Sequence, residues 1–320
     1  MTHPIQLGVV MDPIQSINPK KDSTLAMLLE AQARGWALWY MEPGDLWIQD
    51  GRVDGRMQRL VVRDDPGAWF ELQATQEQPL HRLDVVLMRK DPPFDMEYVY
   101  TTYLLELAEM RGLLVVNRPQ ALRDANEKVF ATWFPQCMVS IIVTRSMARI
   151  RAFLHQHQRI VVKPLDGMGG TSVFQLSTSD PNIGVVLETL TARQSRFTMA
   201  QRFVEAIHTG GDKRILLVDG DPVPHALARM PAQGESRGNL AAGGKGVGAD
   251  LTARDRWICD QVGPTLREKG LLFVGLDVIG DYLTEINVTS PTCIRELDQI
   301  YAINISASLL DRIESRLTAR

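Results

Sequence analysis

The sequence has few of the features that place a chain in a special class. Its three cysteines, Cys137, Cys259 and Cys293, are far apart and odd in number. They form neither a zinc pattern nor a disulfide framework, which predicts a reducing compartment, the cytoplasm. No apolar run could span a membrane, and the N-terminus lacks the basic start and apolar core of a signal peptide. A net charge of −3 over 320 residues gives no case for nucleic-acid binding. We therefore expect an ordinary globular protein of about two or three domains.

An acid-bearing apolar stretch near the C-terminus, residues 275–287, is the most informative feature that is present. Two apolar runs flank Gly280–Asp281, a turn signal, which predicts a β-hairpin. Asp277, Glu285 and Asn287 carry oxygen atoms inside these otherwise apolar strands. Because a buried carboxylate without a partner is costly, they are candidates for a cation site, and Mg²⁺ shared with a nucleotide phosphate is the natural occupant. The alternative is a strand pair whose acids face solvent.

The register of this hairpin tests the cation hypothesis, because ligands of one ion must lie on one face. A simple two-residue turn at Gly280–Asp281 would pair Asp277 with Thr284 and send Glu285 to the opposite face. A loop of odd length, or a bulge, would pair Asp277 with Glu285 and leave Asn287 on the same face. A metal site therefore requires one of these irregularities, and we expect the turn not to be a simple two-residue one.

The order of strand and helix patterns predicts a chain of α/β and α+β type. In the first third, apolar strand patterns alternate with helical ones, so we expect an open parallel sheet covered by helices. Strands are expected at 6–11, 37–41, 83–88 and 113–116, and helices at 22–35 and 98–111. Further strands are expected at 141–144, 159–163, 172–176 and 197–203, a hairpin at 214–230, and helices at 147–157, 182–192, 254–269 and 307–317. Residues 231–250 lack periodicity, which is typical of a functional lid or a disordered segment.

A lysine at the end of an apolar strand precedes a glycine-dense loop. Lys163 closes the strand at 159–163, and the loop that follows contains Gly167, Gly169 and Gly170. Glycines let backbone N–H groups approach an anion closely, and the lysine adds a positive charge, so this segment is a candidate phosphate site. It is not a Walker A loop, because no Gly-Lys-Ser/Thr follows and the next element is a strand. The alternative is an ordinary tight turn.

The lysine strand, the glycine loop and the Asp-x7-Glu-x-Asn pattern of the hairpin together resemble the ATP-grasp ligases. Longer runs narrow the resemblance to the bacterial glutathione synthetases. These runs are LMRKDPPFD at 87–95, VKPLDGMGG at 162–170, RGNLAAGG at 237–244 and TEINVTSPT at 284–292. The resemblance implies an N-terminal α/β substrate domain at 1–123, followed by two ATP-grasp lobes that hold ATP between them. The central lobe, with the glycine loop, would span 124–202, and the C-terminal lobe, with a lid and the metal site, 203–320.

The resemblance also implies a role for individual residues. The residues implied to bind the nucleotide are Lys128, Lys163, Gly167, Met168, Gly169, Gly170, Gln201, Arg202, Phe203, Val204 and Asp212. The implied metal ligands are Asp277, Glu285 and Asn287, and the implied catalytic residues are Arg214, Arg229 and Lys163. The residues implied to bind the other substrates are Arg89, Arg229, Arg237, Asn239, Ser290, Pro291 and Thr292. Without the resemblance, Lys128 would be taken for a solvated helix lysine and each arginine for a surface ion-pair partner.

The reaction that the resemblance implies is the ATP-dependent ligation of γ-glutamylcysteine and glycine through an acyl phosphate, which yields glutathione, ADP and phosphate. Mg²⁺ would be the cofactor, with Mn²⁺ as a substitute, and the lid at 230–245 would protect the acyl phosphate from water. The family resemblance suggests a homotetramer. Two alternatives remain: an ATP-grasp ligase with another acceptor, and an ATP-binding regulatory module without catalysis. The motif runs around Arg89 and 290–292 argue against the first alternative, and the intact lysines and acids argue against the second.

Overall fold

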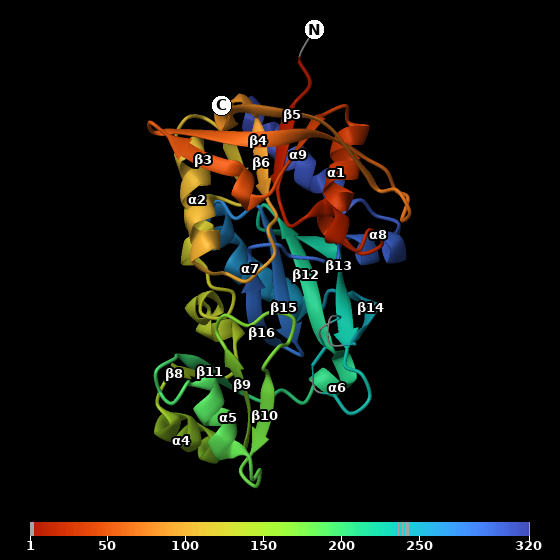
Figure 1. Cartoon of the computed structure of the whole chain (residues 1–320). Coiled ribbons are helices and arrows are strands. Elements are labelled where there is room, and N and C mark those ends of the chain that lie inside the picture. The colour runs from red at the N-terminus through yellow and green to blue at the C-terminus, as the bar shows by residue number, and fades with distance from the viewer. Residues whose placement is uncertain (1–2, 236, 239, 241–242, 320) are drawn as a thin grey trace.

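A computed structural model describes residues 3–235, 237–238, 240 and 243–319. These residues form three β-sheets that follow one another along the chain (Figure 1). The predicted combination of an α/β part and two α+β parts is confirmed. None of the helices in the described part of the chain has the length and hydropathy needed to cross a bilayer.

The N-terminal sheet is built around four parallel strands, as the sequence predicts. They are β1 (Gln6–Val10), β2 (Ala37–Met41), β6 (Val85–Met88) and β7 (Leu114–Val116), in the order β2-β1-β6-β7. Nearly every residue of these strands is buried, which explains their continuous apolar runs. Three antiparallel strands extend the sheet and were not predicted: β3 (Leu46–Gln49), β4 (Arg52–Val62) and β5 (Phe70–Pro79).

Helices from both ends of the chain cover this sheet. Asp22 caps α1 (Ser23–Ala33) by accepting a 2.6 Å hydrogen bond from the amide of Leu25, and Asp95 caps α2 (Met96–Glu109) in the same way. A short helix, α3 (Pro119–Asp124), follows β7. The last helix, α9 (Ile305–Thr318), returns to lie beside α1 (Figure 1), where Arg34 forms a 2.8 Å ion pair with Asp311. The C-terminus therefore helps to build the N-terminal core.

The middle sheet has four strands in the order β10-β9-β11-β8. They are β8 (Ile141–Thr144), β9 (Arg159–Pro164), β10 (Phe174–Ser177) and β11 (Thr198–Arg202). Helices α4 (Met147–His157) and α5 (Ile183–Leu190) share one apolar cluster with Ile160 and Val162 of β9. Because successive side chains of a strand point to opposite faces, Val161 and Lys163 face away from that core.

The C-terminal sheet is antiparallel, in the order β14-β13-β12-β15-β16. Its strands are β12 (Asp212–Val218), β13 (Asp221–Met230), β14 (Lys245–Asp250), β15 (Phe273–Ile279) and β16 (Tyr282–Asn287), and its helices are α6 (Ile207–Gly210), α7 (Ala253–Lys269) and α8 (Ile294–Tyr301). The prediction of an irregular segment over all of 231–250 was wrong for β14, which pairs with β13 despite its two glycines. The two strands leave 231–244 as the connection in which a lid was expected.

Candidate active site

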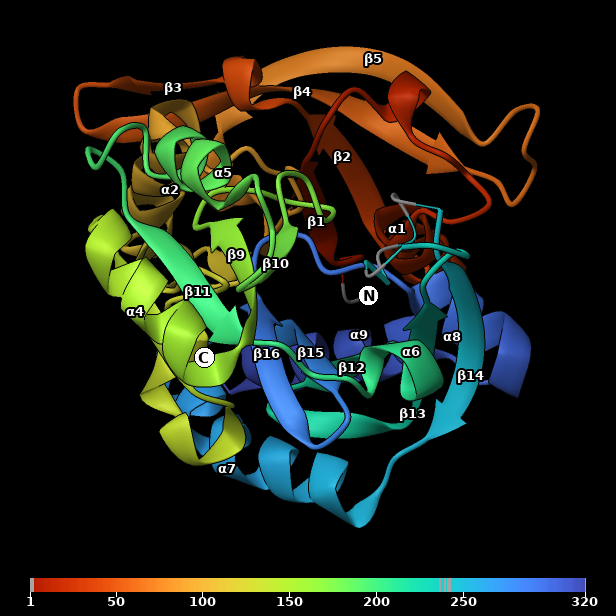
Figure 2. The same cartoon turned by 90° about the horizontal axis from the view of Figure 1, so that it is seen from below.

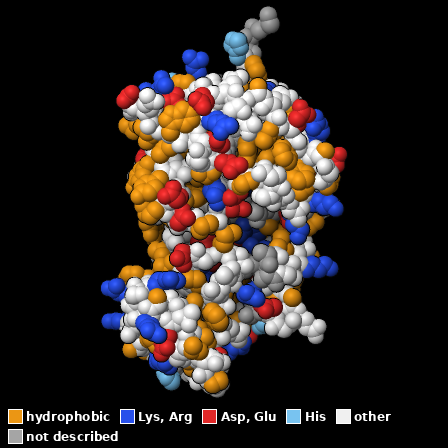
Figure 3. Space-filling model, in the orientation of Figure 1, with side chains coloured by type: hydrophobic (Ala, Val, Ile, Leu, Met, Phe, Trp, Pro, Cys, Tyr) orange, Lys and Arg blue, Asp and Glu red, His pale blue; other side chains and the backbone are white. Residues whose placement is uncertain are grey.

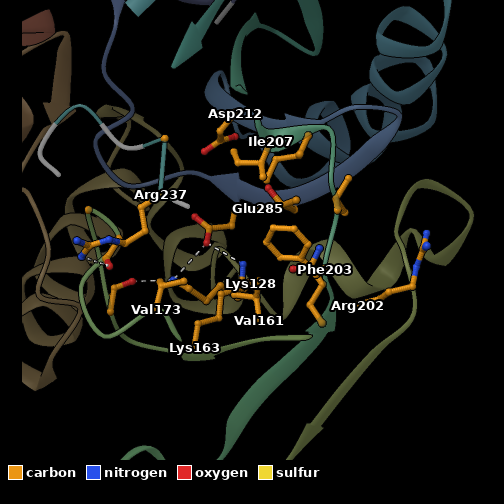
Figure 4. A pocket seen from close by; sticks show the side chains of 18 residues that line it. Lys128, Val161, Lys163, Val173, Arg202, Phe203, Ile207, Asp212, Arg237 and Glu285 are labelled. Carbon is orange, nitrogen blue, oxygen red and sulfur yellow. Dashed lines mark hydrogen bonds and ion pairs between the residues drawn. The ribbon is translucent and has the colours of Figure 1, made fainter. Parts of the chain in front are cut away.

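The residues that were predicted to bind phosphate meet in a cavity of about 100 Å³ between the middle and C-terminal sheets. Val161 and Lys163 reach it from the open face of β9, and Glu285 reaches it from β16 (Figure 4). Lys163 Nζ lies 3.0 Å from Glu285 Oε1, so these two side chains meet across the cavity, although their strands belong to different sheets (Figure 2). Other expected nucleotide residues line the same cavity: Lys128, Gly167, Gly169, Gly170, Gln201, Arg202, Phe203, Val204 and Asp212. Met168 instead lines the neighbouring cavity that contains Asp277.

The hairpin of β15 and β16 has the register that a shared cation site requires. Asp277 lies directly opposite Glu285, and Gly275 lies opposite Asn287, so all three oxygen-bearing side chains project from one face. The turn itself is the two-residue turn Gly280–Asp281 that was expected to be absent. A β-bulge at Thr284 restores the pairing, and the Thr284 hydroxyl donates a 3.0 Å hydrogen bond to the Asp277 carbonyl. The required irregularity is therefore a bulge rather than a longer loop.

Two arginines from the neighbouring strands converge on the same face. Arg214 of β12 lies opposite Asp277 and binds its carboxylate with two hydrogen bonds, of 2.6 Å from Nε and 3.0 Å from Nη2. Arg229 of β13 lies opposite Asp212, and its Nη2 lies 2.5 Å from Asp212 Oδ2 and 3.0 Å from Asp277 Oδ1. Gly275 makes room for Arg214, because a Cβ at that position would lie 2.9 Å from Arg214 Cδ.

The charges of this face are balanced within the protein. Burial alone would raise the pKa of Asp277, but the positive charges of Arg214 and Arg229 outweigh it and hold that pKa below its ordinary value. Burial is likewise outweighed at Glu285, where Lys163 and Lys128 hold the pKa below the ordinary value. Both acids are therefore ionised at neutral pH, and their partners are the cations that an ATP phosphate would also attract.

Lys128 links the hairpin to the glycine loop. It is only 2% exposed, which excludes a solvated lysine. Its Nζ lies 3.7 Å from Glu285 Oε1 and donates a 2.7 Å hydrogen bond to the carbonyl of Gly167. It also pairs with Glu127, whose backbone carbonyl accepts a hydrogen bond from Ile286 of β16. Lys128 is thus held at the point where the metal hairpin, the glycine loop and the cavity meet.

Asp212 has an unusual environment for an acid that is expected to contact a nucleotide. Burial raises its pKa to about 7, and the charges of Asp277 and Glu285 act in the same direction, although Arg229 opposes them. Its Oδ1 is buried and has no hydrogen-bond partner among the described residues. A buried acceptor without a donor is costly, which fits a carboxyl group whose ionised form is disfavoured by burial.

A second cavity, of about 220 Å³, lies beyond the hairpin on the side of the N-terminal domain. Arg214, Arg229, Asp277 and Asn287 form one wall, and the predicted substrate loop 290–292 forms another. A ligand in this cavity would lie between the two arginines and the hydroxyl-bearing loop.

Arg89 lies behind the substrate loop and is only 6% exposed. It does not line the second cavity. Its Nη2 donates a 3.0 Å hydrogen bond to the carbonyl of Pro291, and its Nε donates one of 3.0 Å to Thr24. In this structure Arg89 therefore fixes the position of the loop.

Two described residues of the predicted lid, Arg237 and Gly238, line the cavity. Arg237 lines it and donates a 3.3 Å hydrogen bond from Nη1 to the carbonyl of Gly170 in the glycine loop (Figure 4). Gly238 packs on the backbone of β13, where a Cβ would lie 2.4 Å from the carbonyl oxygen of Arg229. Asn239, also expected in the lid, lies outside the described residues.

Sequence reasoning missed three residues of this region. Glu127 lines the second cavity, and Thr284 forms the bulge. Asn117, which follows β7, ties the N-terminal sheet to the hairpin, because its side chain donates 2.7 Å hydrogen bonds to the carbonyls of Phe273 at the start of β15 and Val288 just after β16. Glu127 could have been found from its place next to Lys128 in the sequence. The bulge could not, because Thr284 is compatible with either register of the hairpin.

The acidic residues suit a hard divalent cation that completes its shell with phosphate. Among the residues that the structure describes, no three His, Cys, Asp or Glu side chains form a ready-made metal centre. The hairpin offers two carboxylates and one amide, with Asn287 Nδ2 only 3.2 Å from Asp277 Oδ2. Mg²⁺ is commonly bound by one or two carboxylates together with substrate phosphates and water, so this donor set fits.

Comparison with solved structures defines the class of fold. The D-cycloserine synthetase DcsG superposes with a TM-score of 0.68, at 14% identity, over 96% of this chain and 99% of that one. The ATP-grasp ligase PsnB complexed with a precursor peptide and AMPPNP gives a TM-score of 0.63, at 16% identity and 98% coverage of both chains. The chain therefore has the ATP-grasp ligase fold.

Sequence comparison identifies the family within that class. The model of the prokaryotic glutathione synthetase N-terminal domain matches residues 5–123, and the model of the prokaryotic glutathione synthetase ATP-grasp domain matches residues 127–302. Glutathione synthetases of Pseudomonas putida and Yersinia pestis are 63% and 58% identical, over 99% and 98% of both chains. The chain belongs to the prokaryotic glutathione synthetase family, and it is an ATP-dependent ligase that forms a C–N bond.

Proposed function

We propose that this chain joins γ-glutamylcysteine to glycine at the expense of ATP, and that the described face of the C-terminal sheet is where phosphate is transferred. The observation that supports the site is the convergence of Lys128, Lys163, Arg214 and Arg229 on two ionised acids at the junction of two cavities. These cations surround the place where the triphosphate of ATP must meet the substrate carboxylate. The acyl phosphate that forms from the two is negatively charged as well.

The reaction proceeds in two steps that need no protein nucleophile. A carboxylate oxygen of γ-glutamylcysteine attacks the γ-phosphorus of ATP, and ADP leaves. The amine of glycine then attacks the acyl carbon and loses a proton, and phosphate leaves with the oxygen that came from the carboxylate. The protein contributes chiefly by positioning the reactants and by offsetting the charge that develops during each step.

The cations divide between the two cavities. Lys128 and Lys163 lie in the cavity lined by the glycine loop, where they would bind the phosphates of ATP. Arg214 and Arg229 lie in the second cavity, where their forked guanidinium groups suit the transferred phosphoryl group and the acyl phosphate. We propose that Asp277, Glu285 and Asn287 hold Mg²⁺, with Mn²⁺ as a substitute, and that the ion adds positive charge at the transferred group.

Binding of ATP and a divalent cation would change the ion pairs that Asp277 and Glu285 form on this face. In the described structure the arginines neutralise Asp277 and the lysines neutralise Glu285. If a divalent cation bound the two acids, the four side chains would be available to substrate oxygens. The internal ion pairs therefore keep the site assembled before substrates bind.

The remaining contacts are assigned by position. The strand end at 201–204 would present its backbone to adenine, beside the apolar side chains of Val161 and Ile207. Asp212 lines the cavity of the glycine loop and would contact the nucleotide. Ser290, Pro291 and Thr292, held by Arg89, would bind a carboxylate of the peptide substrate, and Arg237 and Asn239 would act from the lid.

The proposed reaction is tested by incubating the purified protein with ATP, Mg²⁺ and γ-glutamylcysteine, with and without glycine, and measuring ADP and glutathione. The expected result is glycine-dependent formation of equal amounts of both products. No glycine-dependent ADP release would contradict the proposal. Turnover with another amine acceptor would indicate a different ligase, and ATP binding without turnover on any acceptor would indicate a regulatory module.

We further propose that the protein acts in the cytoplasm as a homo-oligomer, a tetramer by family resemblance. Free and buried Cys137, Cys259 and Cys293 are compatible with a reducing compartment. Exposed apolar side chains on α2 and at its C-terminal end, among them Met96, Tyr100, Tyr103 and Met110, favour an interface there (Figure 3). Sedimentation equilibrium would measure the oligomeric state, and a monomer would contradict this proposal.

The division into 1–123, 124–202 and 203–320 also remains a proposal. Each of the three sheets lies within one of these ranges, which supports it. The packing of α9 on α1 means that the last range does not form a unit wholly separate from the first. Expression of residues 1–123 alone would test their independence, and a folded product would contradict the need for α9.

A further inference from the structure

The hairpin of β15 and β16 carries one of its cation candidates at an exposed position of the sheet order. β16 is the outermost strand of the C-terminal sheet and is paired with β15 alone among the described strands, and Asn287 is its final residue. The last registered pair of the hairpin is Gly275 with Asn287. The end of an edge strand frays readily, because few hydrogen bonds hold it. A side chain that is to hold a cation from this position therefore needs support from outside the hairpin.

Asn117 supplies this support from the N-terminal sheet, which lies above the hairpin in Figure 1. It follows β7 directly and is only 3% exposed. Its Nδ2 donates one 2.7 Å hydrogen bond to the carbonyl of Phe273 and another to the carbonyl of Val288. Its Oδ1 accepts a 2.9 Å hydrogen bond from the amide of Phe273. The side chain thus joins the two strands just beyond the pair of Gly275 and Asn287.

The pattern of hydrogen bonds at this position selects a short amide side chain. Two carbonyl oxygens and one backbone N–H face Asn117, so a single side chain must offer two donors and one acceptor. An ionised aspartate has no donor, and serine has only one. Because the contact is buried, a carbonyl left without a donor is costly, and the end of the hairpin would move to find another.

The backbone around Asn117 is itself fixed. The amide of the next residue, Arg118, donates a 3.2 Å hydrogen bond to the carbonyl of Gly270 at the end of α7. The preceding residue, Val116, is buried in the apolar cluster that also contains Phe273. Asn117 therefore transmits the position of a rigid sheet to the hairpin.

A second contact holds β16 one residue before Asn287. The amide of Ile286 donates a 2.8 Å hydrogen bond to the carbonyl of Glu127. The residues on both sides of Asn287, Ile286 and Val288, are thus each bound by a residue outside the hairpin. Between them, the side chain of Asn287 is kept beside Asp277, with Nδ2 3.2 Å from Oδ2.

We propose that Asn117 is a positioning residue for the divalent cation, which it affects by keeping Asn287 beside Asp277. The inference rests on the proposed function, since the cation is the one proposed there. Without the hydrogen bonds of Asn117, the end of β16 moves away from β15 and the donor set spreads. Residues that orient metal ligands from behind typically change metal affinity or activity by about 10–100-fold when they are replaced.

Binding of Mn²⁺ in the presence of ADP tests this role without any turnover. Titration followed by the electron paramagnetic resonance of free Mn²⁺ measures the affinity. Asn117→Ala should weaken Mn²⁺ binding by about tenfold or more, and Asn117→Ser, which keeps one donor, should lie between this variant and the wild type. ADP binding without metal should be unchanged in both, because Lys128 and Lys163 stay in place.

Ile313→Val is the matched control for lost stability. It removes one methyl group from the apolar cluster that contains Val116 and Phe273, and it leaves every hydrogen bond of Asn117 intact. This variant should bind Mn²⁺ as the wild type does. In steady-state assays, the Asn117 variants should also need about tenfold more Mg²⁺ for half-maximal rate, whereas the control should not.

The results separate this inference from the proposed function. Weaker Mn²⁺ binding by the Asn117 variants, with unchanged metal-free ADP binding, supports the positioning role. Wild-type Mn²⁺ affinity in both variants overturns it, and so does an equal loss in Ile313→Val, since lower stability would then be a sufficient cause. If Asn117→Ala does not fold, Asn117→Ser decides by the same criteria. A wild-type protein that binds no Mn²⁺ with ADP would contradict the proposed metal site as well.

Discussion

Replacing Gly275 with alanine should displace Arg214 without altering a charge. The new Cβ would lie 2.9 Å from Arg214 Cδ and 3.2 Å from both Arg214 Nε and the Cβ of Pro291. The first distance is too short for two carbon atoms, and Arg214 cannot move away freely because its guanidinium binds Asp277 by 2.6 and 3.0 Å hydrogen bonds. The alanine must therefore push the guanidinium, the substrate loop or both out of position.

The expected effect on stability is modest and the effect on turnover is large. Overpacking of a well-packed site costs about 1–3 kcal/mol, which lowers the melting temperature of a chain of this size by only a few degrees. A misplacement of about 1 Å in a positioning group costs about 10²-fold in rate, so kcat should fall by roughly that factor.

Steady-state kinetics with ATP, γ-glutamylcysteine and glycine, together with thermal unfolding, would measure both effects. Gly184→Ala is the control, because its Cβ would meet nothing closer than Arg151 Nη2 at 3.5 Å on helix α5. That variant should keep wild-type activity and stability. A fully active Gly275→Ala enzyme would refute the inference that the missing side chain sets the position of Arg214.

Three further predictions concern charged groups of the site. Glu285→Gln should lower kcat by at least about 10²-fold with an unchanged circular dichroism spectrum, because a neutral amide holds a divalent cation poorly; a fully active variant would refute the metal assignment. Lys163→Met should raise the KM for ATP about tenfold or more, since a charge-assisted contact to phosphate is lost; an unchanged KM in initial-rate measurements would place ATP elsewhere. The pKa of Asp212 rises from 3.8 to about 7 on folding, so its contribution to stability is lost as the pH rises through 7. Asp212→Asn should therefore lose less thermal stability between pH 5 and pH 8 than the wild type, and equal losses would contradict the raised pKa.

The sequence predicted the parallel strands and most helices because their signals are local. Buried parallel strands such as β1 and β6 consist of continuous apolar residues, and α4 begins and ends where its pattern does. The long antiparallel strands β4 and β5 escaped prediction, because β5 is mostly exposed and polar and is held by pairing with β4. Pairing between distant segments depends on contacts that no short window of sequence contains.

The hairpin shows the same limit within the site. Periodicity placed Asp277, Glu285 and Asn287 in two strands and showed that a regular two-residue turn would separate them. It did not show where the irregularity would lie, because Thr284 is compatible with either register. The bulge is selected by packing, since Thr284 is buried and its hydroxyl is satisfied by the carbonyl of Asp277. Contacts that join different sheets, such as the hydrogen bonds from Asn117 to the carbonyls of Phe273 and Val288, left no local signal either.

The central claim is that the reaction passes through an acyl phosphate formed from the carboxylate of γ-glutamylcysteine. Its most direct test is a single-turnover reaction with γ-glutamylcysteine whose reacting carboxylate carries ¹⁸O, followed by mass spectrometry of the phosphate released. The account predicts one ¹⁸O atom in each inorganic phosphate and none in the nucleotide. Unlabelled phosphate, or label in AMP, would contradict it.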